Sequence, residues 1–176
     1  METEFVTAYV GIGSNLGDRA GNLLLGVRGL MEASFQVTKL SAIYETEPVG
    51  IDDAPTFLNM VAEIKAVGIT PTQMLARMLR IEYLLGRTDK SLKKPRTIDL
   101  DLLLYSDLIR EQATLRLPRR EIDEYACVLR PLAELAPKAR HPRSGERSVT
   151  RALFIDRKVS GMPASGVRSL TPVLFR

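Results

Sequence analysis

The chain of 176 residues contains only one cysteine, Cys127, and only one histidine, His141. A single cysteine cannot form a disulfide within the chain, and a single histidine cannot build a histidine metal cluster. No stretch approaches the roughly 20 apolar residues that a membrane-spanning helix needs. The N-terminal sequence METEFVTAYVG is acidic and lacks the apolar run of a secretory signal. We therefore expect a cytoplasmic protein without a membrane partner, and we expect His141 to lie at the surface.

Aromatic residues are also scarce, at 6% of the chain. This scarcity argues against an RNA-binding sheet domain, which needs two or three exposed aromatic side chains. The formal net charge of +4 suits an anionic ligand, but it is too small to distinguish a nucleotide from a nucleic acid. A hydrophobic content of 45% and a charged content of 26% are ordinary for a globular protein, and the length suits one domain. We assign that domain to residues 1–158 and interpret residues 159–176, with their glycines and prolines, as a flexible tail.

The hydrophobic pattern predicts the order strand–helix–strand–strand–helix–strand. Strands are expected at 5–12, 35–44, 57–66 and 95–105, and the first helix is expected at 19–33 with Asp18 as its N-cap. Thr70, Pro71 and Gln73 are typical of a capped helix start, and Gly86 is typical of a helix end. A short strand pair at 108–117 and turns with helical pieces at 119–135 follow. This order predicts the α+β class with a ferredoxin-like βαββαβ core, a mostly antiparallel sheet with helices packed on it.

Two aspartates begin the last predicted strand, in the stretch PRTIDLDLLLY from Pro95 to Tyr105. Side chains alternate along a strand, so Asp99 and Asp101 share one face with their Cα atoms roughly 6.6 Å apart. Neighbouring carboxylates repel each other unless a cation or a basic partner meets them, and Mg²⁺ typically takes one or two carboxylates plus substrate phosphates. The alternative is a strand end with solvated acids and a surface salt bridge, and the spacing leaves both interpretations open. The opposite face is expected to carry Leu100, Leu102 and Leu104.

Phe57 and Asn59 are expected to share one face of the third strand. A phenyl ring offers a stacking plane, and an amide offers both a donor and an acceptor, so the pair suits a flat heterocycle such as a pterin. The alternative is a core phenylalanine beside an asparagine at the strand edge.

The segment from Gly86 to Thr97 carries a run of basic residues against one acid, Asp89. Such a run is usually a solvated face, but this one immediately precedes the acid pair, so we interpret it as a lid over a triphosphate. Glu82 lies near the end of the preceding helix, where the dipole disfavours a carboxylate, and it therefore needs a cation or a donor. Arg80 or Arg87 could be that partner.

Glycines near the N-terminus have the spacing Gly11-x-Gly13-x-x-x-Gly17. The dinucleotide-binding fingerprint would place its third glycine at Leu16 and would need a ribose-binding acid further on. We therefore interpret this segment as a tight turn into a helix.

Several stretches together resemble one known family. PRTIDLDLL is similar to the signature of the 6-hydroxymethyl-7,8-dihydropterin pyrophosphokinases of folate biosynthesis. AYVGIGSNLGDR, YETEPVG, FLNMV, IEYLLGR and LRPLAELAP resemble that family in the same order, so the likeness runs from about Ala8 to Phe154. The resemblance implies a pyrophosphokinase domain with a ferredoxin-like fold. It also implies transfer of pyrophosphate from ATP to the hydroxymethyl group of the dihydropterin, which leaves AMP.

The resemblance also implies roles for individual residues. Two Mg²⁺ ions would bridge the triphosphate and the pair Asp99 and Asp101, Arg87 and Arg96 would meet phosphate, and Asp101 is our candidate to take the proton of the substrate hydroxyl. We assign the nucleotide site to Glu82, Arg87, Lys90, Arg96, Leu102, Arg119 and Arg120. We assign the pterin site to Thr46, Val49, Phe57, Asn59 and Cys127. ATP and the pterin are the expected partners of a monomer that binds no nucleic acid.

The chain departs from the family pattern at several of these positions. The usual Pro-His pair is Pro118-Arg119 here, and Arg119 could contact a phosphate but cannot titrate near neutral pH. The second stacking aromatic of the family falls at Cys127, and the usual arginine two positions earlier is Tyr125, although Arg120 or Arg130 could reach the same phosphate. These changes leave an alternative open, a diverged homologue that binds pterin or nucleotide without turnover.

Overall fold

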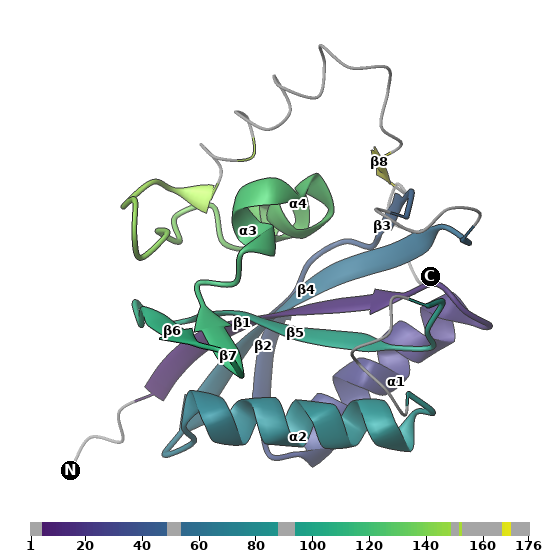
Figure 1. Cartoon of the computed structure of the whole chain (residues 1–176), viewed down its shortest axis with the longest axis horizontal. Helices are drawn as coiled ribbons and strands as arrows, with labels where there is room; N and C mark the ends of the chain where they lie inside the picture. The colour runs from purple at the N-terminus through teal and green to yellow at the C-terminus, as the bar shows by residue number, and fades with distance from the viewer. Residues whose placement is uncertain (1–4, 49–53, 88–93, 149–151, 153–166, 170–176) are drawn as a thin grey trace.

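A computed structural model describes residues 5–48, 54–87, 94–148, 152 and 167–169. Helices α1 and α2 cover one face of a twisted sheet, and helices α3 and α4 lie over part of the other face (Figure 1). In chain order the elements are β1 (Phe5–Ser14), α1 (Arg19–Glu32), β2 (Gln36–Leu40), β3 (Tyr44–Thr46), β4 (Phe57–Val67), α2 (Pro71–Leu84), β5 (Asp99–Tyr105), β6 (Arg110–Gln112), β7 (Leu115–Leu117), α3 (Glu121–Glu124), α4 (Ala126–Leu135) and β8 (Val167–Ser169). None of the helices in the described ranges is long and apolar enough to cross a membrane.

The sheet has the predicted ferredoxin-like order. Its strands run β5-β1-β4-β3-β8, with β2 also paired to β4, and the pairs are antiparallel. The predicted second strand is divided into β2 and β3, because Ser41 interrupts it: the Ser41 hydroxyl accepts the Val61 N–H at 2.9 Å, where a regular ladder would use a backbone carbonyl. The α+β class and the βαββαβ core are confirmed.

Local helix signals in the sequence are also confirmed. The Asp18 carboxylate accepts the Gly21 N–H at 3.0 Å at the start of α1. Thr70 and Gln73 form the reciprocal bonds of a capping box at the start of α2, and Gly86 ends that helix with a φ of +92°. Helix α2 therefore ends at a defined residue, directly before the basic segment and the acid pair.

Two hydrophobic cores lie on opposite faces of the sheet. The first packs β1, β4 and β5 against α1 and α2, with Ile12, Leu30, Ile64, Met78, Leu100 and Leu102 among its members. The second lies under α3 and α4 and contains Val61, Leu103, Leu104, Ile122, Leu129 and Leu132. The prediction that Leu104 shares the face of Leu100 and Leu102 is wrong. Tyr9 pairs with Leu104 and Val10 with Leu102, so Leu103 is an extra residue in a β-bulge, and the alternation shifts by one beyond it.

Two predictions for the C-terminal half need comment. His141 is not at the surface: it is only 5% exposed, its Nε2 lies 3.4 Å from Asp123 Oδ1, and the Ser144 N–H donates to its Nδ1. The sequence Ala-Arg-His-Pro carries no sign of this burial, because the contacts come from α3 and from a turn. Within the predicted tail, Val167–Ser169 pair with β3, while most of 159–176 lies outside the described residues.

Candidate active site

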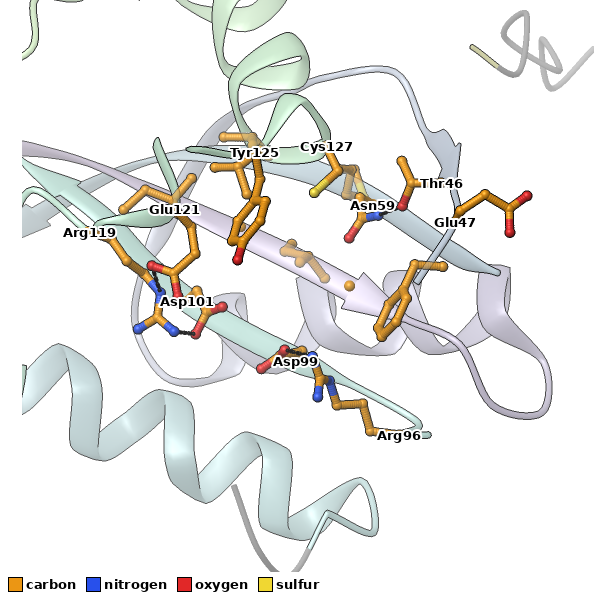
Figure 2. Close-up of a pocket in the computed structure, with 18 of the residues that line it drawn as sticks. Thr46, Glu47, Asn59, Arg96, Asp99, Asp101, Arg119, Glu121, Tyr125 and Cys127 are labelled. Atoms are coloured by element: carbon orange, nitrogen blue, oxygen red, sulfur yellow. Dashed lines mark hydrogen bonds and ion pairs between the residues drawn. The ribbon is translucent and has the colours of Figure 1, made fainter. Parts of the chain in front are cut away.

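A cavity of about 340 Å³ opens between the sheet and the segment that carries α3 and α4 (Figure 2). Gly11 and Gly13 of β1 line it from the sheet, and a Cβ atom at Gly13 would lie 3.0 Å from Asn59 Oδ1. A side chain there would therefore crowd the cavity. The structure brings together nine of the predicted site residues along this cavity: Thr46, Phe57, Asn59, Arg87, Arg96, Asp99, Asp101, Arg119 and Cys127.

The other five predicted site residues are not among the described residues that line the cavity. Val49 and Lys90 fall outside the described residues. The Leu102 side chain is 1% exposed in the first core, on the sheet face away from the cavity. Arg120 is exposed and pairs with Glu124 at 2.6 Å, and Glu82 is buried behind the acid pair. The positions of Leu102 and Arg120 therefore give no support to their assignment to the nucleotide site.

Asp99 and Asp101 lie on the same face of β5 and both line the cavity, as the alternation predicts. Arg87 and Arg96 each form an ion pair with one oxygen of Asp99, the Arg96 contact at 2.9 Å, and Arg119 forms an ion pair with Oδ1 of Asp101 at 3.1 Å. The Asp99 and Asp101 side chains are 14% and 23% exposed, so their ion pairs with the arginines are partly buried and are not salt bridges of solvated surface acids. The acid pair is surrounded by three guanidinium groups that also face the cavity.

The acid pair also fits a magnesium ion by its donor chemistry. Within the described ranges, no group of three or more histidine, cysteine, aspartate or glutamate side chains is placed to hold a metal. The Asp99 and Asp101 carboxylates that line the cavity are hard oxygen donors, which suit Mg²⁺ because that ion takes few protein carboxylates and fills its other positions with water and phosphate oxygens.

Glu82 holds the strand that carries the acid pair through contacts with Arg87 and Leu100. Its carboxylate is 2% exposed, lies 3.1 Å from the Arg87 guanidinium, and accepts the Leu100 N–H at 2.6 Å. Arg87 also donates to the Ile98 carbonyl and to Asp99. Of the two partners suggested by the sequence, Arg87 is thus the one observed. This arrangement holds the end of α2 to the start of β5, so Arg87 reaches Asp99 from a fixed position.

Asn15 holds the segment before β5 to the end of β1, and its role was not predicted. Its side-chain oxygen accepts the Arg96 N–H at 2.7 Å, its backbone N–H donates to the Arg96 carbonyl at 3.1 Å, and its amide group donates to the Pro55 carbonyl at 3.2 Å. The interpretation of this glycine-rich segment as a turn into a helix is confirmed by Gly17, which has a φ of +68°. The sequence gives no sign of the long-range bonds, since they join residues about 40 and 80 positions apart.

Three of the predicted pterin residues, Thr46, Phe57 and Asn59, line the cavity from β3 and β4. The Asn59 amide donates to the Thr46 hydroxyl at 2.7 Å, and the Arg96 guanidinium lies 5.1 Å from the centroid of the Phe57 ring. The cation thus covers a face of the ring next to the acid pair. Phe57 and Asn59 are on the cavity side of β4, which favours a ligand-binding role over a purely internal one.

Glu121 and Tyr125 also line the cavity, although neither was assigned to a site. Figure 2 shows both side chains directed from the α3–α4 segment toward Asp101. Glu121 binds Arg119, with 3.2 Å between the Arg119 Nε and a Glu121 oxygen. The only available signal was their nearness in sequence to Arg119 and Cys127.

Cys127 is expected to react slowly with iodoacetamide in the native protein. Burial raises the pKa of its thiol to about 11, so about 0.1% is thiolate at pH 8, and the thiolate is the reactive form. The alkylation rate should rise steadily as the pH increases toward 11. Mass spectrometry of the alkylated fraction, with urea-unfolded protein as the rapidly reacting control, measures this. Equal rates in native and unfolded protein at pH 8 would contradict it.

Comparisons with known proteins identify the family of this chain. A model of the 7,8-dihydro-6-hydroxymethylpterin-pyrophosphokinase family matches residues 9–137. The 2-amino-4-hydroxy-6-hydroxymethyldihydropteridine pyrophosphokinase of Bacillus subtilis is 38% identical over 156 residues, which are 88% of this chain and 93% of that protein. The protein of the same name from Methylorubrum extorquens is 41% identical over 131 residues, 74% of this chain and 82% of that one.

A solved structure shows the same fold in a longer chain. The crystal structure of wild-type Plasmodium falciparum HPPK-DHPS with pteroate matches with a TM-score of 0.74 at 14% identity, over 92% of this chain and 46% of that chain. At that identity the likeness shows the fold alone. The family model and the two bacterial relatives show more: this chain belongs to the 7,8-dihydro-6-hydroxymethylpterin-pyrophosphokinase family of diphosphotransferases.

Proposed function

We propose that this protein transfers pyrophosphate from ATP to 6-hydroxymethyl-7,8-dihydropterin in folate biosynthesis, with Mg²⁺ as cofactor. The hydroxymethyl oxygen forms a bond to the β-phosphorus while the bond from that phosphorus to the α-phosphate oxygen breaks. The products are the pterin diphosphate and AMP, and the proton of the hydroxyl group is released. The supporting observation is one cavity in which the acid pair and its three arginines lie beside the Phe57–Asn59–Thr46 wall.

Different residues of the cavity would contact the nucleotide and the pterin. Arg96 and Arg119 present guanidinium donors beside the carboxylates, where the charges of a triphosphate would lie. When bound, Mg²⁺ supplies neutralisation of the phosphate charge, with Asp99 and Asp101 as its protein ligands. Asp101 remains our candidate for accepting the hydroxyl proton. Such transfer depends mainly on positioning and electrostatics, so a preformed charged wall is what the chemistry requires.

The test is a product analysis. Purified protein is mixed with MgATP and 6-hydroxymethyl-7,8-dihydropterin, and the nucleotides are followed by chromatography or ³¹P NMR. AMP that appears only with pterin and Mg²⁺ is the expected result, and ADP in its place would mean a different reaction. Saturable binding of pterin or ATP without AMP would favour the non-catalytic homologue, which the changes at Arg119, Tyr125 and Cys127 motivate. We further propose a cytoplasmic monomer, and light scattering after size-exclusion chromatography tests the monomer.

Phe57→Ala is expected to weaken pterin binding. Stacking of a base on an aromatic side chain contributes about 1–3 kcal/mol, which corresponds to roughly 5- to 150-fold in affinity. Isothermal titration with the pterin in the presence of a non-hydrolysable MgATP analogue measures the change. Phe5→Ala is a matched control, because Phe5 is 54% exposed and begins β1 at the end away from Gly13. Unchanged affinity in Phe57→Ala would assign the ring to the protein core alone.

A further inference from the structure

Arg119 is held between two carboxylates on different elements. Its Nη2 lies 3.1 Å from Oδ1 of Asp101 on β5, and its Nε lies 3.2 Å from Oε2 of Glu121 at the start of α3. Figure 2 shows the guanidinium bridging the two side chains at the cavity wall. Its backbone N–H donates to the Leu103 carbonyl at 2.9 Å, so the main chain is fixed beside β5 while the side chain projects into the cavity.

The Asp101–Arg119 pair conflicts with metal binding at the same carboxylate. Arg119 occupies Oδ1 of Asp101, and a divalent cation that used this oxygen would meet a positive guanidinium at hydrogen-bond distance. Two cations at that separation repel each other strongly in a partly buried site. A metal that uses Oδ1 therefore stays weakly bound unless the arginine leaves Asp101.

The Arg119 side chain is held by fewer buried contacts than the Arg87 side chain, so it can move away from its aspartate more easily. The Arg87 side chain is 6% exposed and is held by buried Glu82 and by the Ile98 carbonyl in addition to Asp99. The Arg119 side chain is 31% exposed, and Glu121, which is 33% exposed, offers a second anchor away from Asp101. The guanidinium can therefore turn from Asp101 toward the cavity and keep one of its ion pairs.

We propose that Arg119 competes with the divalent cation for Asp101 and moves to a phosphate of the nucleotide when the metal–nucleotide complex binds. Glu121 is the positioning residue that keeps Arg119 within reach during this exchange. The proposal rests on the proposed function, since it takes Asp101 as a metal ligand and a triphosphate as the ligand. Its consequence is that metal alone binds weakly, whereas metal and nucleotide favour each other's binding.

Arg119→Gln separates the two halves of the proposal, because it removes both the competitor of the metal and the phosphate contact. We expect the variant to bind Mn²⁺ without nucleotide at least about fivefold more tightly than the wild type, and to bind the Mg²⁺ complex of α,β-methylene-ATP at least about fivefold more weakly. Electron paramagnetic resonance of free Mn²⁺ measures the first affinity, and isothermal titration measures the second. A residue that only supported the fold would weaken both.

Arg116→Gln is the matched control. Arg116 is 50% exposed on β7 and pairs with Glu111, and it does not line the cavity, so both affinities should stay at the wild-type values. Arg119→Lys keeps the charge and should return both affinities part of the way. Thermal unfolding of each variant shows that the fold is intact.

The outcomes distinguish this proposal from the proposed function. If the wild type does not bind the Mg²⁺–α,β-methylene-ATP complex, the proposed function fails and this proposal fails with it. If the wild type binds the complex, but Arg119→Gln leaves Mn²⁺ affinity unchanged or lowers it, the competition at Asp101 is disproved and the proposed function is untouched. Affinities that change in opposite directions support the exchange.

Discussion

Asp99→Asn is expected to lower the rate of AMP formation by about a thousandfold or more, because it removes one of the two negative charges that the acid pair offers to a metal. The amide keeps the shape of the carboxylate and one oxygen for Arg87 or Arg96, so the structural loss is smaller than with alanine. The rate is measured at saturating pterin with increasing Mg²⁺, so that weaker metal binding and slower chemistry are separated.

Asp107→Asn is the control for this experiment. Asp107 is exposed in the turn after β5, two residues beyond the end of the strand that carries Asp99, and it does not line the cavity. Its replacement should leave the rate unchanged. A near-normal rate in Asp99→Asn would remove the acid pair from the mechanism, whereas an equal loss in both variants would point to a general effect on the fold.

The charges around the acid pair bear on both interpretations that the sequence left open. Spacing alone left Asp99 and Asp101 as either metal ligands or members of a salt bridge. The structure shows ion pairs to Arg87, Arg96 and Arg119, but these lie at a cavity rather than at an open strand end. Arginines that neutralise the carboxylates can also bind phosphate oxygens, because the guanidinium fork suits both anions.

Patterns of short range allowed most of the fold to be predicted. The alternation along β4 places Phe57 and Asn59 together on the cavity side, and the alternation at the start of β5 does the same for Asp99 and Asp101. The helix caps depend on residues three positions apart, so the sequence shows them directly. The resemblance to a family added what no pattern provides, namely the expectation of ATP and a pterin as substrates.

Features that depend on distant contacts were not predictable. The bulge at Leu103 arises from the register between β1 and β5, and no residue in the leucine-rich stretch marks it. The division of the second strand needs Ser41 to meet Val61. Asn15 acts through partners about 40 and 80 positions away in the sequence. At Leu103 and Ser41 an extra residue or a polar side chain replaces a regular ladder contact, and hydrophobic periodicity does not show such a replacement.

Glu82→Ala is expected to lower the free energy of unfolding by about 3–5 kcal/mol, since breaking a buried ion pair from one side leaves a buried charge with less compensation. The Arg87 guanidinium, 6% exposed, would lose this carboxylate, and the Leu100 N–H would lose the acceptor 2.6 Å away. For a chain of this size, each kcal/mol corresponds to about 2–4 °C, so the unfolding midpoint should fall by roughly 6–20 °C. Calorimetry or circular dichroism measures the shift.

Glu32→Ala separates burial from ion pairing in this prediction. Glu32 is 62% exposed on α1 and pairs with Arg28 four residues earlier, so its removal should cost about 0.3–0.5 kcal/mol and hardly move the midpoint. Glu82→Ala should also reduce catalysis at temperatures where it remains folded, because Arg87 would no longer be fixed against Asp99. A midpoint as close to the wild type as that of Glu32→Ala would mean that α2 and β5 are held together by apolar packing alone, with Glu82 free to serve the nucleotide.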